Sequence, residues 1–260
     1  MRQHRLAGRL VLAALFAFLY VPIGVVVALS FNDAGLPTVW SGFSLRWYGR
    51  LAENGDILAA ARHTLIVAVA ATLISTALGT LLALGIETRR RKSRGLEALV
   101  FAPMIIPDIV LAVALLSFFS WLDVTMGLHT IIVSHVVFDL AFVCAVVRAR
   151  LKSFDFSLVE ASRDLGAPAI TTFFRITLPV ILPAVIAGAL LAFTLSVDEF
   201  IIAFFTAGPG RDSITLPMQI YSMIRFGVTP EINALATLVM AVSVIALVIS
   251  QRFNKGGMMP

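Results

Sequence analysis

Residues 157–179 read SLVEASRDLGAPAITTFFRITLP, a pattern typical of two short helices joined by a sharp turn. Ser157, followed three residues later by Glu160, forms a capping box and predicts that a helix begins there. Gly166 suits the left-handed residue that ends a helix, and Pro168 fits the first turn of the next one. A two-turn helix is marginal alone, so this pair is expected to dock against another surface.

The chain on both sides of this stretch is strongly apolar. Of its 260 residues, 59% are hydrophobic and 13% are charged, whereas about 25% are charged in an ordinary soluble domain. A soluble globule of 28.0 kDa needs more polar cover than this composition supplies. The composition therefore predicts an integral membrane protein and excludes an ordinary soluble enzyme or binding module.

Six apolar runs have the length of about 20 residues that a helix needs to cross the hydrocarbon core. Two proline residues, Pro103 and Pro107, should kink the third run because each removes a backbone donor. We therefore predict an all-α membrane protein with a single transmembrane domain, residues 1–260, and a core of five spans within 60–250. The approximate runs are Leu10–Leu29, Thr64–Ile86, Leu99–Leu122, Ile131–Val147, Val180–Phe205 and Asn233–Ile249.

The basic residues are distributed unevenly among the connections. Fifteen of the 20 lysines and arginines lie in 1–9, 87–98, 148–178 and the C-terminal tail. Because basic connections stay on the cytoplasmic side, both termini and the loop 148–178 are predicted to be cytoplasmic. The net charge of +5 is explained by this topology, and nucleic acid binding is not needed to account for it.

The loop between the fourth and fifth runs resembles the EAA motif of ABC importer permeases. The resemblance is carried by Glu160-Ala161-Ser162, then Gly166, then Ile176-Thr177-Leu178-Pro179, with Ser162 where alanine is usual. In that family the loop forms coupling helices that insert into a groove on the ATPase subunit. The resemblance implies the type I importer permease fold, with coupling residues Glu160, Ala161, Ser162, Arg163, Asp164, Gly166, Leu178 and Pro179. The alternative, that Glu160 only caps and Gly166 only turns, stays open.

The sequence contains no G-x-x-x-x-G-K-[ST] motif, which a phosphate-cradling loop would need. We therefore expect no enzymatic site and no cofactor in this chain. ATP and Mg²⁺ are expected on partner ATPase subunits, and the assembled complex would be the ATP-driven transporter.

Four carboxylates fall inside or at the edges of the predicted spans, whereas no lysine or arginine does. They are Asp108, Asp139, Asp198 and Glu199. A charge at bilayer depth costs about 2.5–3.5 kcal/mol on insertion scales, so such a residue normally faces a cavity or a partner. Acidic residues without basic partners predict a pathway that accepts cations.

Each of these carboxylates also has a structural alternative. Glu199 completes a capping-box pattern with Ser196 and would then restart a broken helix. Asp108 follows Pro107 and would satisfy the backbone donors that the kink frees. Asp139 would pair with His135, one helical turn earlier.

Beyond the motif, nearly the whole chain is similar to the smaller permease subunit of spermidine/putrescine importers. This similarity implies a heterodimer with a sister permease, two ATPase subunits and an extracytoplasmic binding protein. It places Asp108, Asp198 and Glu199 on the substrate pathway, and Tyr20 and Trp47 are candidates for cation–π contacts. The matching segments include Tyr20-Val21-Pro22, Ser30-Phe31-Asn32, Pro107-Asp108-Ile109-Val110, Ser134-His135, Arg150-Leu151-Lys152-Ser153-Phe154-Asp155, Phe193-Thr194-Leu195-Ser196-Val197-Asp198-Glu199 and Pro230-Glu231-Ile232-Asn233-Ala234-Leu235-Ala236-Thr237.

Two further connections have expected roles. Aromatic and apolar residues in 30–63 predict a helix at the outer membrane interface. The segment 207–232, with a turn-rich start at Gly208-Pro209-Gly210, is expected to contact the binding protein. The rival functions are an ABC permease for another small solute, an ion-coupled secondary transporter and a channel subunit.

Overall fold

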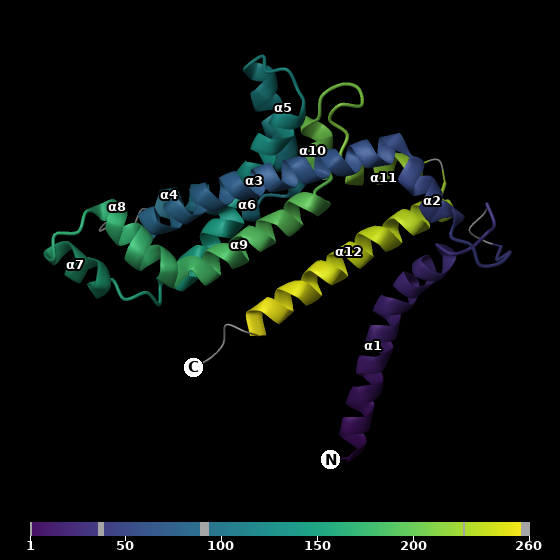
Figure 1. The fold of residues 1–260 in the computed structure, drawn as a ribbon, viewed down its shortest axis with the longest axis horizontal. Coiled ribbons are helices and arrows are strands. Elements are labelled where there is room, and N and C mark those ends of the chain that lie inside the picture. The colour runs from purple at the N-terminus through teal and green to yellow at the C-terminus, as the bar shows by residue number, and fades with distance from the viewer. Residues whose placement is uncertain (1, 36–38, 89–93, 226, 256–260) are drawn as a thin grey trace. The chain divides into compact units, whose positions relative to one another are not determined.

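The computed structural model describes residues 2–35, 39–88, 94–225 and 227–255, and most of them are helical (Figure 1). Among these residues there is no β-strand, and the β-bridge between Asn32 and Phe43 is isolated. The all-α fold class predicted from the composition is therefore confirmed. The elements are α1 (Arg2–Leu29), α2 (Arg46–Glu53), α3 (Gly55–Thr88), α4 (Arg94–Phe101), η1 (Ala102–Met104), α5 (Asp108–Trp121), α6 (Leu128–Leu151), α7 (Ser157–Asp164), α8 (Ala169–Thr172), η2 (Phe173–Thr177), α9 (Leu178–Asp198), α10 (Ile201–Thr206), α11 (Leu216–Ile224) and α12 (Pro230–Lys255).

The chain divides into two compact units, of which the first comprises Met1–Leu58 and Gln219–Pro260. Within it, α12 contacts both α1 and α2, and the Asn54 amide donates to the Glu231 carboxylate at 3.3 Å. The helix predicted in 30–63 is α2. Its Trp47 is buried, and the indole N–H donates to the Asn32 carbonyl at 2.8 Å. The segment before α2 is thus fastened to the helix.

The second unit, Ala59–Met218, is organised around α6. Helix α9 packs along α6 (Figure 1), and 61% of the most apolar stretch of α6 is buried. Helix α3 approaches α6 closely, because a Cβ atom added at Gly79 would lie 2.9 Å from the Val143 side chain. Small residues at such crossings let membrane helices approach until their backbones nearly touch.

Four stretches are long and apolar enough to cross a membrane: Gly8–Leu29, Gly55–Thr88, Leu128–Leu151 and Ala169–Asp198. A fifth results if the bent pair Arg94–Met104 and Asp108–Trp121 is counted as one span. The sixth predicted run falls within α12, whose 26 residues give a helix of about 39 Å. Each of the six predicted runs therefore coincides with helical structure.

Two of the runs are more broken than the sequence pattern predicted. The third run does not merely kink, because its two halves meet at 105° around Pro107. The fifth run is interrupted at Glu199, where the backbone becomes extended between α9 and α10. It also begins earlier than predicted, since α8 continues through the π-helical turn η2 into α9. Broken helices at bilayer depth expose backbone groups only where protein or a cavity can satisfy them.

Candidate functional site

Helix α7 begins at Ser157, as the sequence predicted, but a different residue caps it. The Asp155 carboxylate accepts a hydrogen bond from the Ser157 N–H at 3.0 Å, and Ser157 itself is the first helical residue. The capping box of Ser157 and Glu160 was therefore the wrong mechanism. Hydrogen bonds from the Ser157 hydroxyl and then from its N–H lower the pKa of Asp155. Because that pKa is lowered, this contact stabilises the fold above the ordinary pKa of Asp and is lost as the pH falls through the lowered value.

Gly166 ends α7 in the left-handed conformation that the sequence predicted, with φ of +82°. Its N–H donates to the Arg163 carbonyl at 2.9 Å, and the Ala167 N–H donates to the Ser162 carbonyl at 3.1 Å. These two bonds form a Schellman motif, which satisfies carbonyls at the helix end. Pro168 lies one position earlier than predicted, as the N-cap residue of α8.

Ser162 stands at the motif position where alanine is usual, and its hydroxyl makes a hydrogen bond that alanine could not make. Its side chain is buried, and its Oγ lies 2.9 Å from the Thr172 Oγ1. Since the Thr172 hydroxyl donates to the Pro168 carbonyl at 3.3 Å, the Ser162 hydroxyl is the donor to Thr172. A buried side-chain bond thus joins α7 to α8 across the Gly166 turn.

Replacing Ser162 with alanine is expected to loosen this pair of helices by about 1 kcal/mol, the usual net value of one hydrogen bond. Thr172 keeps its bond to Pro168, so no buried hydroxyl is left unpaired. Amide hydrogen exchange of residues 157–172 should accelerate about fivefold. Ser153→Ala removes an exposed hydroxyl from the same connection and serves as the control; equal exchange in both variants would contradict the prediction.

One side of the α7–α8 pair is anchored and the other is exposed. Phe156 and Val159 pack on the core formed by α3, α6 and α9. Glu160, Ala161, Arg163, Asp164, Gly166 and Pro179 are exposed, and Leu178 is half-buried. Large apolar side chains are exposed too, with Leu165 at 89% and Ile170 at 74%. An exposed apolar surface beside charged residues is typical of a docking site.

The break between α9 and α10 holds two of the predicted pathway residues. The Glu199 Oε1 accepts a hydrogen bond from the Ile202 N–H at 2.7 Å, so Glu199 does restart the helix. Ser196 takes no part in that cap. Asp198 is the last residue of α9 and its side chain is exposed. At this break the Glu199 carboxylate is hydrogen-bonded to the backbone, whereas the Asp198 carboxylate is exposed.

The carboxylate at the break between α9 and α10 acts electrostatically with one carboxylate on each of two other helices. Glu199 interacts with Asp108, the first residue of α5, and with Asp139 of α6. Asp108 is half-buried and stands directly after the 105° bend. Helix α5, which follows the first helix break, packs against α10, which follows the second. The two breaks therefore lie near each other, and Asp139 of α6 interacts with Glu199 there.

The predicted pair of Asp139 and His135 does not form. The His135 Nδ1 lies 2.7 Å from the Ser196 Oγ of α9. Among the described residues, neither the His135 Nε2 nor either Asp139 oxygen has a hydrogen-bond partner, although both side chains are almost fully buried. Sequence reasoning missed Ser196 as a partner, because a serine in an apolar run gives no signal of what lies opposite it.

The two aromatic candidates lie in the first unit. Tyr20 is exposed on α1, and its ring stacks on Phe16 with centroids 5.9 Å apart. The Trp47 ring already carries two cations, with Arg46 at 4.6 Å and Arg50 at 5.0 Å from its centroid. Among the described residues no three His, Cys, Asp or Glu side chains group as metal ligands.

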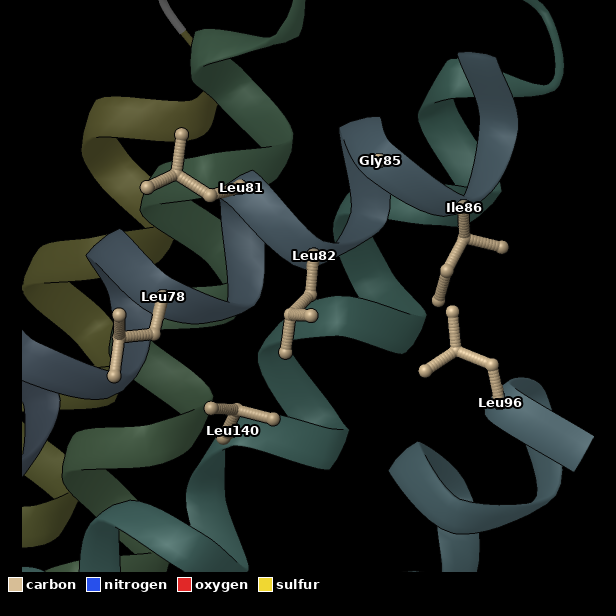
Figure 2. A pocket seen from close by; sticks show the side chains of 7 residues that line it. All are labelled: Leu78, Leu81, Leu82, Gly85, Ile86, Leu96 and Leu140. Carbon is tan, nitrogen blue, oxygen red and sulfur yellow. The ribbon is translucent and has the colours of Figure 1, made fainter. Parts of the chain in front are cut away.

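Residues of α3, α4 and α6 form an apolar groove (Figure 2). Its volume is about 470 Å³, and none of the carboxylates described above lines it. An apolar lining cannot stabilise a charged solute, so the groove is not the cation pathway. It is lined by Leu78, Leu81, Leu82, Gly85, Ile86, Leu96 and Leu140.

The loop connecting α10 and α11 is held against the start of α3. The Leu216 N–H donates to the Thr64 hydroxyl at 2.7 Å, and the His63 Nδ1 lies 3.0 Å from the Ile214 carbonyl. Between these anchors and α10, residues 209–212 are exposed. The turn-rich start that the sequence pointed out is therefore presented at the surface.

Comparison with known proteins agrees with this architecture. Residues 75–255 match the family described as "Binding-protein-dependent transport system inner membrane component". The spermidine/putrescine transport system permease protein PotC of Escherichia coli K12 is 39% identical over 241 residues, which cover 92% of this chain and 90% of that protein. The putrescine transport system permease protein PotI of the same organism is 42% identical, covering 90% of this chain and 85% of that protein.

Solved structures share the fold at lower identity. A chain of a bacterial ABC transporter involved in the import of the acidic polysaccharide alginate matches with a TM-score of 0.77 and 15% identity, covering 99% of this chain and 97% of that one. A chain of the inward-facing MetNI methionine ABC transporter matches with a TM-score of 0.59 and 22% identity, covering 82% and 99%. At these identities the likeness concerns the fold alone. On the family match and on the close relatives, this chain belongs to the inner membrane components of binding-protein-dependent transport systems.

Proposed function

We propose that this chain is the permease subunit through which an ABC importer moves polyamines such as spermidine and putrescine into the cytoplasm. The observation that carries the proposal is the acidic cluster at the two helix breaks. Glu199 acts electrostatically on Asp139, Asp108 acts on Glu199, and Asp198 is exposed next to Glu199 in the chain. No lysine or arginine occurs in 95–147 or 176–210, so the chain supplies no nearby cation from these spans.

Polyamines carry two or more ammonium groups, and carboxylates at bilayer depth are costly unless a cation or cavity compensates them. A passing ammonium would supply that compensation for a short time. The names of the close relatives support the same substrate class. The alginate importer shares the fold, so the fold itself does not select the substrate.

The energy source is proposed to be two partner ATPase subunits, one of which docks on the α7–α8 pair of this chain. Glu160, Arg163 and Asp164 are exposed for charge pairing there, and Leu165 and Ile170 offer apolar contacts. Nucleotide binding on the partners would pull this pair and shift the complex between inward- and outward-facing states. The basic connections place α7, α8 and both termini in the cytoplasm under the same proposal.

The remaining partners are a sister permease, which would form a heterodimer with this chain, and an extracytoplasmic binding protein. The exposed residues 209–212 are the proposed contact for the binding protein. Family membership favours this assembly over the ion-coupled transporter and the channel. An importer of another small solute is the alternative that the experiment below separates.

The deciding experiment is uptake of labelled spermidine and putrescine by cells with and without this chain, in a background that lacks other polyamine importers. We expect uptake to disappear without the chain, to return on re-expression and to stop when cellular ATP is depleted. Unchanged polyamine uptake in cells without the chain would show that the substrate class is wrong. Uptake that survives ATP depletion would overturn the energy source.

A further inference from the structure

An ion triad joins three helix ends at the side of the second unit that carries the α7–α8 pair. Arg148, in the last turn of α6, donates from Nε to the Glu87 Oε1 at 2.5 Å and from Nη1 to the Glu97 Oε2 at 3.0 Å. Glu87 lies at the end of α3, and Glu97 lies in the first turn of α4. Only 13% to 29% of each side chain is exposed.

The chemistry of the triad is specific to arginine. The planar guanidinium reaches two carboxylates through separate nitrogens, which a lysine ammonium does not reproduce. The Arg148 guanidinium also lies 5.7 Å from the centroid of the Phe101 ring at the end of α4. Arg148 at the C-terminal end of α6 and Glu97 at the N-terminal end of α4 interact favourably with their helix dipoles, whereas Glu87 at the C-terminal end of α3 depends on the arginine. Loss of the arginine would leave two carboxylates largely buried and unpaired.

The triad belongs to the same packed core as the base of the α7–α8 pair. Val147 and Leu151, on either side of Arg148 along α6, share one hydrophobic cluster with Phe156 and Val159 of the α7 segment. Leu96 and Phe101 of α4 pack on that cluster as well. Movement of α7 therefore reaches α6 through apolar contacts and reaches α4 through both apolar contacts and ion pairs.

Helix α4 leads directly to the acidic cluster. It continues through η1 and the bend at Pro107 to Asp108, which acts electrostatically on Glu199. Apolar contacts in a membrane protein gain little from the hydrophobic effect and can slide. A guanidinium that pairs with two carboxylates through separate nitrogens, mostly shielded from solvent, fixes the orientation of the helices as well as the distance between them.

We infer that Arg148 is a positioning residue for energy coupling, because it fastens α3 and α4 to α6 so that movement of the α7–α8 pair displaces Asp108. This inference rests on the proposed function, since it assigns a role in the same transport cycle. Replacing Arg148 should leave the complex able to hydrolyse ATP, but less solute should be transported for each ATP hydrolysed.

The test uses the whole complex reconstituted in vesicles with its ATPase subunits and binding protein, measuring spermidine uptake and ATP hydrolysis together. For Arg148→Met we expect the uptake per ATP hydrolysed to fall about tenfold, within the usual range of coupling energies between sites. Arg148→Lys should fall between Arg148→Met and the wild type. Arg150→Met is the matched control, since Arg150 lies in the same helix turn and donates to the Val180 backbone carbonyl; its ratio should be unchanged.

A neutral variant separates positioning from simple charge balance. Arg148→Met combined with Glu87→Gln and Glu97→Gln removes all three charges, so assembly should recover even if Arg148→Met assembles poorly. We expect its uptake per ATP to stay low. Recovery of the wild-type ratio in this variant, or an unchanged ratio in Arg148→Met, would overturn the inference. If the wild-type complex takes up no polyamine, the proposed substrate fails instead, and the triad is then judged by whether its loss weakens stimulation of ATP hydrolysis by the binding protein.

Discussion

Gly166→Val is expected to reduce ATP-driven uptake more than tenfold while the protein still inserts and assembles in the membrane. A β-branched residue at φ of +82° is strained by about 1–2 kcal/mol, and the Schellman bonds from Gly166 and Ala167 would open to relieve it. The direction in which α8 leaves the turn would then change. Because α8 continues into α9, the docking surface would no longer be rigidly joined to the span that it must move.

The measurement is uptake together with ATP hydrolysis at equal amounts of assembled complex. Gly166→Asn is the matched variant, because asparagine tolerates the left-handed region much better than valine. It should retain most of the uptake. If valine and asparagine reduced uptake equally, the loss would come from the added side chain in the docking surface and not from the turn. Normal uptake by Gly166→Val would remove the turn from the coupling mechanism.

Asp198→Asn is expected to lower the rate of polyamine uptake at low concentration by about tenfold to a hundredfold, since a hydrogen bond to a charged group contributes about 1.5–3 kcal/mol. Asp198 is exposed at the end of α9, whereas its neighbour Glu199 is engaged by the Ile202 N–H. The asparagine side chain keeps the shape and loses the charge. Assembly and basal ATP hydrolysis should therefore be unaffected.

The control is Asp123→Asn, which makes the same chemical change in the connection between α5 and α6. Asp123 has φ of +54°, a conformation that asparagine accepts as readily as aspartate. Its uptake should match the wild type. Equal loss in the two variants would mean that net charge and not position matters, and unchanged uptake by Asp198→Asn would remove that residue from the pathway.

The local features of the α7–α8 pair could be predicted because they depend on a few adjacent residues. Glycine is the residue favoured where the backbone turns left-handed at the end of a helix, so Gly166 predicted the turn from the sequence. The cap was mistaken because Asp155 and Ser157 both offer an oxygen to the same helix start, and the sequence does not decide which one is used. The hydrogen bond from Ser162 to Thr172 depends on the angle between α7 and α8, so no sequence pattern predicted it.

The acidic cluster was predicted in part. The cost of placing carboxylates in apolar spans singled out Asp108, Asp139, Asp198 and Glu199 from the sequence. The i to i+4 spacing favoured a pair of His135 with Asp139, but the structure turns the imidazole toward Ser196. The rotation of α6 about its axis decides whether His135 faces Asp139 or Ser196, and that rotation is set by the packing of α6 against α9.

The sequence by itself determined the membrane class, the positions of the six apolar runs, the turn at Gly166 and the family. These follow from composition and from short-range backbone chemistry, since a chain in lipid must satisfy its backbone bonds within each helix. Only the tertiary structure decided that the two helix breaks meet, that Asp139 joins them, and that Arg148 selects Glu87 and Glu97. Those contacts join residues far apart in the chain, and they depend on how whole helices rotate and cross, which no local pattern encodes.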